Sequence, residues 1–347
     1  MSRRRRGRAA LAVVAVALLV LGACGGSGDE GDAEGAAAAA PADEGAFPVT
    51  IEHKYGETVV EEAPERVVSV GFTEQDSLLA LGIVPVGIRD WYGDQPDATW
   101  PWAQDELGDA EPEVLSSEDI NFEAVAALRP DLIVGVSSGM TDQEYDTLSE
   151  IAPTLAQTDE YVDFGTPWQD QLELVGRAVG RSDEAAALTE DLEGRFADIR
   201  AEHPELQGQE VAVSYAVSES EIGAYGTQDV RGRLMLDIGM AIPDEFDELA
   251  GDQFYSSFSL EEVERLDRDV VVWVSASDAI NQRIADSPVR QQLDAVDEGR
   301  EVFLTAEQAA AAGFSSPLSL PYLLDELVPM LTAAVDGDPA TEVPDAL

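Results

Sequence analysis

Sulfur and imidazole ligands are scarce in this sequence of 347 residues, which contains one cysteine and two histidines. Because Cys24 is the single cysteine, no disulfide can form within the chain, and the fold must be stabilised by its hydrophobic core. A bare transition metal prefers His or Cys ligands, and His53 and His203 lie far apart in the sequence. The residues available therefore argue against a resident metal site.

Basic residues are also few, since 20 Lys and Arg face 70 Asp and Glu, for a net charge of −50. Lys54 is the single lysine. Five of the arginines lie within the first eight residues, and without them 15 basic residues face 70 acidic ones, a net charge of −55. Such a field repels nucleic acid and anionic lipid surfaces, so neither is an expected partner. The acidic residues are spread along the chain, which we interpret as adaptation of the surface to a salty or alkaline medium.

Long apolar runs are missing apart from Ala9–Leu21, which follows the arginines. This run is shorter than the about 20 residues of a transmembrane helix and has the size of a signal-peptide core. It ends in Leu21-Gly22-Ala23-Cys24, which resembles the lipobox of bacterial lipoproteins. We therefore predict a lipoprotein signal peptide over residues 1–23 and a lipid on Cys24 that anchors the protein to the cell membrane, facing outside the cytoplasm. The alternative is an ordinary cleavage site beside an incidental cysteine.

Composition also predicts how the rest of the chain is divided. Residues 24–46 consist mainly of Gly, Ala, Asp and Glu without large apolar side chains, which predicts a flexible tether. The remaining part is long enough for two domains. We assign an N-terminal α/β lobe to residues 47–180, a linking helix to 181–205 and a C-terminal α/β lobe to 206–340.

Alternation of β-branched runs with helical patterns supports these lobes. In the first lobe, strands are predicted at 66–71, 84–88 and 131–136, and helices at 73–81 and 122–128. Further strands are predicted at 211–217, 270–274 and 302–304 in the second lobe. This alternation is typical of parallel sheets, so the predicted fold class is α/β with two Rossmann-like lobes joined by one long α-helix.

The linking helix is predicted from a single apolar stripe. Leu188, Leu192, Phe196 and Ile199 are spaced by four, four and three residues, and Ser182 is a candidate N-cap. A helix of about 20 residues spans about 30 Å and forms a stiff joint. We therefore expect a ligand cleft between the lobes and little closure of one lobe onto the other.

Residues 135–139 match the G-x-S-x-G pattern of serine hydrolases directly after a predicted strand. A hydrolase that uses Ser137 would need a histidine beside it. His53 precedes the first sheet strand and His203 ends the linking helix, so neither is a natural base. A secreted serine hydrolase is therefore the alternative function, and we expect no enzymatic activity and a Gly/Ser turn at this position.

Aromatic and arginine side chains are the best candidates for ligand contacts. Arg89, Trp91 and Tyr92 follow the strand at 84–88, and the carboxyl ends of parallel strands face a ligand crevice. Arg231 and Arg233 lie near Tyr225, just before a helix, and a guanidinium can bind anionic oxygen or stack on a ring. Core packing of the aromatic residues and surface salt bridges of the arginines are the alternatives.

Two glutamates occupy equivalent positions in an internal repeat. Residues 122–136 align without gaps on residues 260–274, and Glu123 coincides with Glu261. Each lies two residues after a predicted helix cap, Asn121 or Ser259. A carboxylate there complements the positive end of the helix dipole, which is a structural explanation for both.

Several sequence phrases resemble the siderophore-binding proteins of iron ABC importers, of the ferric-hydroxamate-binding type. They include Arg66-Val67-Val68-Ser69, Leu148-Ser149-Glu150-Ile151-Ala152-Pro153-Thr154 and Ser316-Pro317-Leu318-Ser319-Leu320-Pro321. The resemblance covers the chain from Val49 onward and implies two α/β lobes, one linking helix, a shallow cleft and a ferric siderophore as ligand. Cobalamin and haem binders share the architecture, so these ligands remain the alternatives.

The resemblance also implies roles for individual residues and partners. In the family, cleft arginines and aromatic residues contact the metal chelate, and one glutamate per lobe docks onto permease arginines. Glu123 and Glu261 match the docking positions. The implied partners are a ferric siderophore and an ABC permease with its ATPase, for a monomer that carries no cofactor and touches the membrane through its lipid anchor alone. The implied ligand-binding residues are Arg89, Trp91, Tyr92, Tyr225, Arg231, Arg233, Trp273 and Phe314.

Overall fold

The computed structural model describes residues 41–216, 218, 221–275 and 277–344. The chain divides into residues Met1–Ala38 and Ala39–Leu347, and the fold is that of the second part. The predicted signal peptide, the lipidation site Cys24 and most of the predicted tether lie outside the described residues. Within the described part of the chain, no helix is long and apolar enough to cross a membrane.

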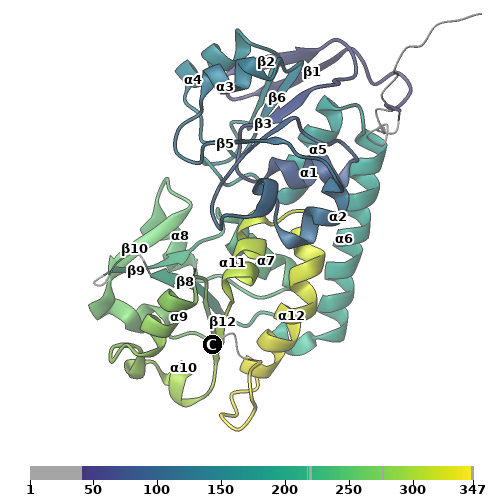
Figure 1. Cartoon of the computed structure of the whole chain (residues 1–347). Helices are drawn as coiled ribbons and strands as arrows, with labels where there is room; N and C mark the ends of the chain where they lie inside the picture. Colours follow the sequence, from purple (N-terminus) through teal and green to yellow (C-terminus); the bar gives the residue numbers. More distant parts are fainter. Residues whose placement is uncertain (1–40, 217, 219–220, 276, 345–347) are drawn as a thin grey trace, which may run out of the picture. The chain divides into compact units, whose positions relative to one another are not determined.

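The N-terminal lobe is built on a sheet with strand order β5-β4-β3-β6-β7, in which all neighbours are parallel. An antiparallel hairpin of β1 and β2 precedes this sheet (Figure 1). The predicted strands and helices of this lobe are confirmed, although each is shorter than predicted. The strands are β1 (Val49–His53), β2 (Gly56–Val60), β3 (Val67–Ser69), β4 (Gly87–Arg89), β5 (Glu113–Leu115), β6 (Leu132–Gly135) and β7 (Thr154–Ala156). The helices are α1 (Glu74–Ala80), α2 (Gln104–Leu107), α3 (Phe122–Ala127), α4 (Asp142–Ser149) and α5 (Trp168–Ala178).

The C-terminal lobe has a mixed sheet with strand order β10-β9-β8-β11-β12. The three predicted strands β8, β11 and β12 are parallel, whereas β9 and β10 add to the edge in antiparallel orientation. The lobe is therefore not a topological copy of the first. Its strands are β8 (Val211–Ala216), β9 (Glu221–Tyr225), β10 (Tyr255–Ser259), β11 (Val270–Trp273) and β12 (Glu301–Phe303). Its helices are α7 (Val230–Ile238), α8 (Asp244–Ala250), the 3-10 helix η4 (Leu260–Leu266), α9 (Asp278–Ala285), α10 (Asp294–Asp297), α11 (Ala306–Phe314) and α12 (Ser319–Ala334).

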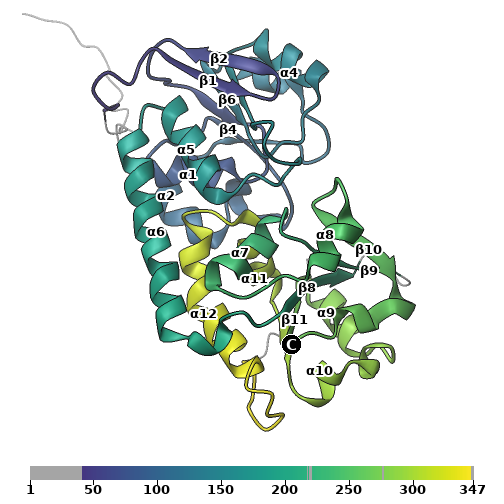
Figure 2. The ribbon, with the colours of Figure 1, turned by 180° about the vertical axis from the view of Figure 1, so that it is seen from behind.

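The long helix α6 (Ser182–Glu202) connects the lobes and packs against α5 of the first and α7 of the second (Figures 1 and 2). Its predicted stripe is confirmed, since Leu192 and Phe196 are buried and their neighbours in the stripe pack against the same core. Ser182 is the first helical residue and Arg181 occupies the cap position, one residue earlier than predicted.

A second connection comes from the C-terminal helix. Helix α12 packs against the 3-10 helix η2 (Pro101–Ala103) of the N-terminal lobe, and Asp325 of α12 pairs with Arg195 of α6 at 2.6 Å. The chain crosses between the lobes once, through α6, and the packing of α12 on η2 adds a second contact that opposes large rotations of one lobe against the other.

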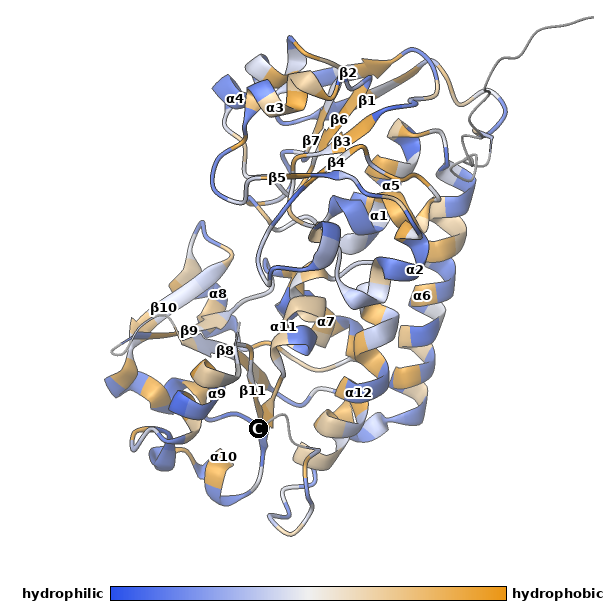
Figure 3. Ribbon diagram, viewed as in Figure 1, coloured by the Kyte–Doolittle hydropathy of each residue, from blue (hydrophilic) through white to orange (hydrophobic). Residues whose placement is uncertain are grey.

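The core lies along the central strands of both sheets, where apolar residues gather (Figure 3). Leu132, Ile133 and Val134 of β6 have no exposed surface, and neither do Val270 and Val271 of β11. Strands that are apolar on both faces are typical of sheets covered by helices on each side. This covering leaves the carboxyl ends of the strands as the place where polar and aromatic side chains can gather.

Candidate ligand-binding site

A cavity of about 280 Å³ lies where neighbouring parallel strands of the N-terminal lobe end. Phe72 and Thr73 follow β3, Trp91 follows β4, and Ser137 follows β6. The C-terminal lobe closes the other side with the end of β9, the start of α7 and the end of α11. The cavity is lined by Phe72, Thr73, Trp91, Ser137, Phe164, Thr166, Trp168, Gln171, Tyr225, Asp229, Val230, Arg231, Phe254, Gly313, Phe314 and Ser315.

Aromatic rings form a nearly continuous wall around this cavity. The ring centroid of Phe72 lies 5.7 Å from that of Trp91 and 6.1 Å from that of Phe164. Phe254 of the C-terminal lobe continues the row at 5.8 Å from Phe164, and Phe314 lies 5.5 Å from Trp91. Such spacings are those of packed aromatic pairs, so the wall is an apolar surface that rings of both lobes share.

Two of the lining residues have a positive φ, a backbone conformation that is rare for residues other than glycine. Phe164 has a φ of 65° and Ser315 a φ of 41°. Each such residue costs about 1–3 kcal/mol, and such conformations cluster at binding sites. The ring of Phe164 also lies over Gly139, where any side chain would collide with it. The glycine of the G-x-S-x-G turn therefore makes room for a cavity wall.

Arg231 is the one cation among the lining residues of the cavity. Its guanidinium lies 4.5 Å from the centroid of the Tyr225 ring and 3.0 Å from a carboxylate oxygen of Asp229. Burial acts to lower the pKa of Arg231, but Tyr225, Asp229 and Tyr92 together raise it, so the guanidinium stays charged. Burial raises the pKa of Asp229, and the charge of Arg231 opposes that rise.

Arg89 supports the wall from behind and does not line the cavity. Its guanidinium lies 4.2 Å from the centroid of Phe72 and donates to the carbonyl oxygens of Val70 and Glu118 at 3.3 and 2.8 Å. The nearby carboxylate of Glu74 is fully buried and accepts the backbone N–H groups of Thr73 and Ser137. Burial raises the pKa of Glu74, while these hydrogen bonds and the charge of Arg89 oppose the rise.

Asp76 joins α1 to the segment that follows α11. One of its oxygens accepts hydrogen bonds from Ser316 Oγ at 2.6 Å and from Trp102 Nε1 at 2.8 Å. Its other oxygen has no hydrogen-bond partner among the described residues. Burial raises the pKa of Asp76 to about 7, although the two hydrogen bonds oppose the rise.

The structure places the predicted ligand-binding residues in three groups. Trp91, Tyr225, Arg231 and Phe314 line the cavity. Tyr92 packs edge-on against Trp91, with ring centroids 4.7 Å apart, and so belongs to the layer behind the wall together with Arg89.

Arg233 and Trp273, also predicted to bind the ligand, are not among the residues that line this cavity. Arg233 points into a neighbouring hollow and stacks 5.1 Å from the centroid of Tyr161. Trp273 is only 1% exposed and donates to Glu301 at 2.8 Å within the C-terminal lobe. Its position at the end of β11 suggested a site residue, but the side chain points into the core of its own lobe.

Sequence reasoning missed several lining residues. Phe72, Thr73 and Ser137 directly follow predicted strands, and that signal could have found them. Phe164 and Phe254 lie in irregular segments without any local signal. They reach the cavity because the tertiary fold brings these two segments to it.

The two histidines are held away from Ser137. His53 Nε2 lies 2.9 Å from Thr58 Oγ1, and His203 Nδ1 lies 3.0 Å from a carboxylate oxygen of Glu205. The backbone of Ser137 is used for structure, since its N–H donates to Glu74 and its carbonyl oxygen accepts from Phe72 at 3.2 Å. Nothing in this geometry supports the hydrolase alternative.

Glu123 and Glu261 occupy equivalent places in the two lobes. Asn121 accepts the N–H of Ala124 at the start of α3, and Ser259 accepts the N–H of Glu261 at the start of η4. Each glutamate is the second residue of its helix and is exposed. Within the described part of the chain, neither carboxylate makes an ion pair or a hydrogen bond.

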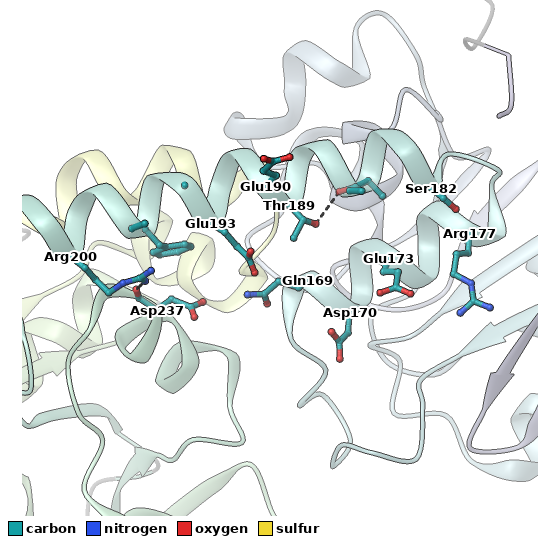
Figure 4. A pocket seen from close by; sticks show the side chains of 15 residues that line it. Gln169, Asp170, Glu173, Arg177, Ser182, Thr189, Glu190, Glu193, Arg200 and Asp237 are labelled. Atoms are coloured by element: carbon teal, nitrogen blue, oxygen red, sulfur yellow. Dashed lines mark hydrogen bonds between the residues drawn. The ribbon is translucent and has the colours of Figure 1, made fainter. Parts of the chain in front are cut away.

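A larger hollow of about 1090 Å³ lies along α5 and α6 (Figure 4). Half of its polar lining residues are acidic, namely Asp170, Glu173, Glu190, Glu193 and Asp237. Its aromatic residue, Phe196, is only 2% exposed, so the hollow offers no ring to a ligand. The smaller cavity between the lobes is therefore the better candidate for an organic ligand.

Comparisons with known proteins agree with this architecture. The profile of a family described as periplasmic binding protein matches residues 67–308. The "Probable siderophore-binding lipoprotein YfiY" of Bacillus subtilis (strain 168) is 31% identical over 234 residues, which cover 65% of this chain and 68% of that protein.

Solved structures are similar over nearly their whole length. A periplasmic solute binding protein from Mycobacterium smegmatis is 35% identical with a TM-score of 0.75, covering 83% of this chain and 98% of that one. The Streptococcus pneumoniae protein PiaA, in complex with ferrichrome, is 26% identical with a TM-score of 0.72, covering 84% of this chain and 99% of that one.

Proposed function

The chain belongs to the periplasmic binding protein family, and on that basis we propose that it captures a ferric siderophore between its lobes and delivers it to an ABC importer. The names of YfiY and of the PiaA complex support siderophores as the ligand class. The observation that carries the proposal is the cavity itself, an aromatic wall with a single arginine. Such a surface suits an organic chelate that has wrapped its metal, because rings pack on the organic part and the guanidinium meets chelate oxygens.

Fluorescence titration tests this proposal directly. Trp91 and Trp168 line the cavity, so a bound ferric chelate should quench the intrinsic tryptophan emission. Mass spectrometry of ligand extracted from protein exposed to iron-starved culture medium would identify the siderophore. The absorbance spectrum separates the alternatives on the same scaffold, since haem shows a Soret band and cobalamin shows corrin bands. A spectrum of either kind, without quenching by any ferric chelate, would contradict the proposal.

Delivery requires contacts with the importer on both lobes, and we assign them to Glu123 and Glu261. Their equivalent positions, exposure and lack of a partner among the described residues support this assignment. Charge pairs of this kind steer association and fix its register. The partners on this proposal are the two permease halves with their ATPase, and the binding protein acts as a monomer without a cofactor.

Anchoring at Cys24 completes the proposed function. The lipobox resemblance and the lipoprotein relative YfiY support a lipid on this residue, which would hold the protein on the outer side of the cell membrane. Cys24→Ser should release the protein into the aqueous phase of a detergent partition. Equal partitioning of the variant and the wild type into detergent would refute the anchor.

A further inference from the structure

The lining of the cavity between the lobes holds two charged side chains of opposite sign. Asp229 is 2% exposed and Arg231 is 12% exposed, and they form a buried ion pair. One Asp229 oxygen accepts from the backbone N–H of Arg231 at 2.8 Å and from its Nη1 at 3.2 Å, and the other accepts from Nη1 at 3.0 Å. The cation that faces the ligand is therefore already neutralised by the protein.

On the N-terminal side of the cavity, the groups that could attract an anion are also paired within the protein. The N–H groups of Thr73 and Ser137, which could bind an anion at this mouth of the sheet, donate to the buried Glu74. Arg89 lies behind Phe72 and donates to backbone carbonyls. Among the lining residues of the cavity, Arg231 is thus the one cation, and it is paired with Asp229.

Ferric siderophores differ in charge according to their chelating groups. Three hydroxamates carry one negative charge each and cancel the charge of Fe³⁺, whereas three catecholates carry two each and leave a trianion. A trianion placed beside Arg231 would also meet the carboxylate of Asp229, and in a poorly solvated cavity one such repulsion changes affinity tenfold or more. The net charge of −50 for the whole chain acts in the same direction.

We propose that Asp229 is a specificity-determining residue that restricts the cavity to uncharged or weakly charged ferric chelates such as tris-hydroxamates, by neutralising Arg231. The inference rests on the proposed function and deepens it. Asp229 also caps α7, and Asn caps helices as well as Asp does. Asp229→Asn therefore removes the charge while keeping the hydrogen-bond acceptor and the shape.

The test compares two chelates, neutral ferrichrome and the trianionic ferric complex of enterobactin, by tryptophan quenching. The wild type should bind ferrichrome at least about tenfold more tightly, which is about 1.4 kcal/mol. Asp229→Asn should shift the ratio of the two affinities at least about tenfold in favour of the trianion. Adding Arg231→Gln to this variant should abolish the gain, because the unmasked guanidinium is its source.

Asp294→Asn is the matched control, since it removes one charge from an exposed first residue of α10, outside the cavity. Asp229→Ser, which also retains a cap, replaces Asp229→Asn if thermal unfolding shows that the latter is not folded. The inference is overturned if the wild type binds both chelates equally, or if Asp229→Asn changes both affinities by the same factor. Binding of neither chelate by the wild type would instead refute the proposed function.

Discussion

At the scale of single residues, Asp76 should make stability depend on pH. Its pKa in the folded protein is about 7 because burial raises it, against 3.8 ordinarily, so the folded state holds one more proton than the unfolded state between these values. The free energy of unfolding should therefore fall as pH rises through this window and level off above it. Asp76→Asn keeps the shape and removes this dependence, so its stability relative to the wild type should grow by a few kcal/mol from pH 4 to pH 8.

Urea unfolding of both proteins across this pH range measures the difference. The exposed Asp294→Asn serves as the control and should follow the wild-type profile. Parallel profiles of Asp76→Asn and the wild type would show that the carboxylate is ionised throughout the range. Ser316 and Trp102 would then be sufficient to hold its charge.

A substitution at Gly313 would test how closely α11 approaches Arg231. A Cβ at this position would lie 2.7 Å from Arg231 Nη2 and 3.3 Å from the ring of Trp91. Gly313→Ala should therefore displace the guanidinium and weaken ligand binding at least about tenfold. The free energy of unfolding should change by less than about 1 kcal/mol, because Ala suits a helix. In α6, Gly194 has open space around it, so Gly194→Ala should leave affinity unchanged and stabilise the protein slightly. Equal affinities of the two variants would separate Gly313 from the site.

At the scale of elements, α6 should contribute to stability through one ring above all. Phe196 is 2% exposed, and its ring lies 6.5 Å from that of Trp168, the first residue of α5 and part of the cavity wall. Phe196→Ala should lower the free energy of unfolding by about 3–5 kcal/mol, since the space left cannot collapse fully. The exposed Asp198→Ala on the same helix should change it by less than about 0.5 kcal/mol. A loss below 1 kcal/mol for Phe196→Ala in urea titrations would mean that α6 acts as a spacer alone.

At the scale of the whole molecule, binding and delivery should be separable. Glu123→Ala combined with Glu261→Ala should leave siderophore affinity within about twofold, because both side chains are exposed on helix starts away from the cavity lining. Uptake of radioactive iron chelate should fall to a small fraction in cells that carry the cognate permease, since each lobe loses its charged contact.

Glu57→Ala with Glu202→Ala is the matched control, in which one exposed glutamate is removed from the β1–β2 hairpin and one from the end of α6. Normal uptake by the Glu123 and Glu261 variant would move docking to other carboxylates of this acidic protein. A fall in ligand affinity instead would assign both residues to helix capping and lobe stability.

The elements that the sequence predicted are those whose signals are local. Val67, Leu132 and Val270 begin strands in β-branched runs, and the spacing of Leu192 and Phe196 predicts the face of α6 that is buried. Strands β9 and β10 were missed, because Gly and Ser interrupt their apolar pattern and the pairing partner defines them.

The sequence by itself determined the fold class, the linking helix and the helix caps that precede Glu123 and Glu261. It also showed that Trp91 and Arg231 lie beside the ends of strands or helices. Such properties depend on residues that are neighbours in the chain. Only the tertiary structure decided that Arg89 lies behind Phe72 and that Trp273 points into the core. It also decided that rings far apart in sequence line one cavity together with the ion pair of Asp229 and Arg231. The reason is physical: the direction of a side chain and the charge it meets are set by packing between segments far apart in sequence, which no local pattern encodes.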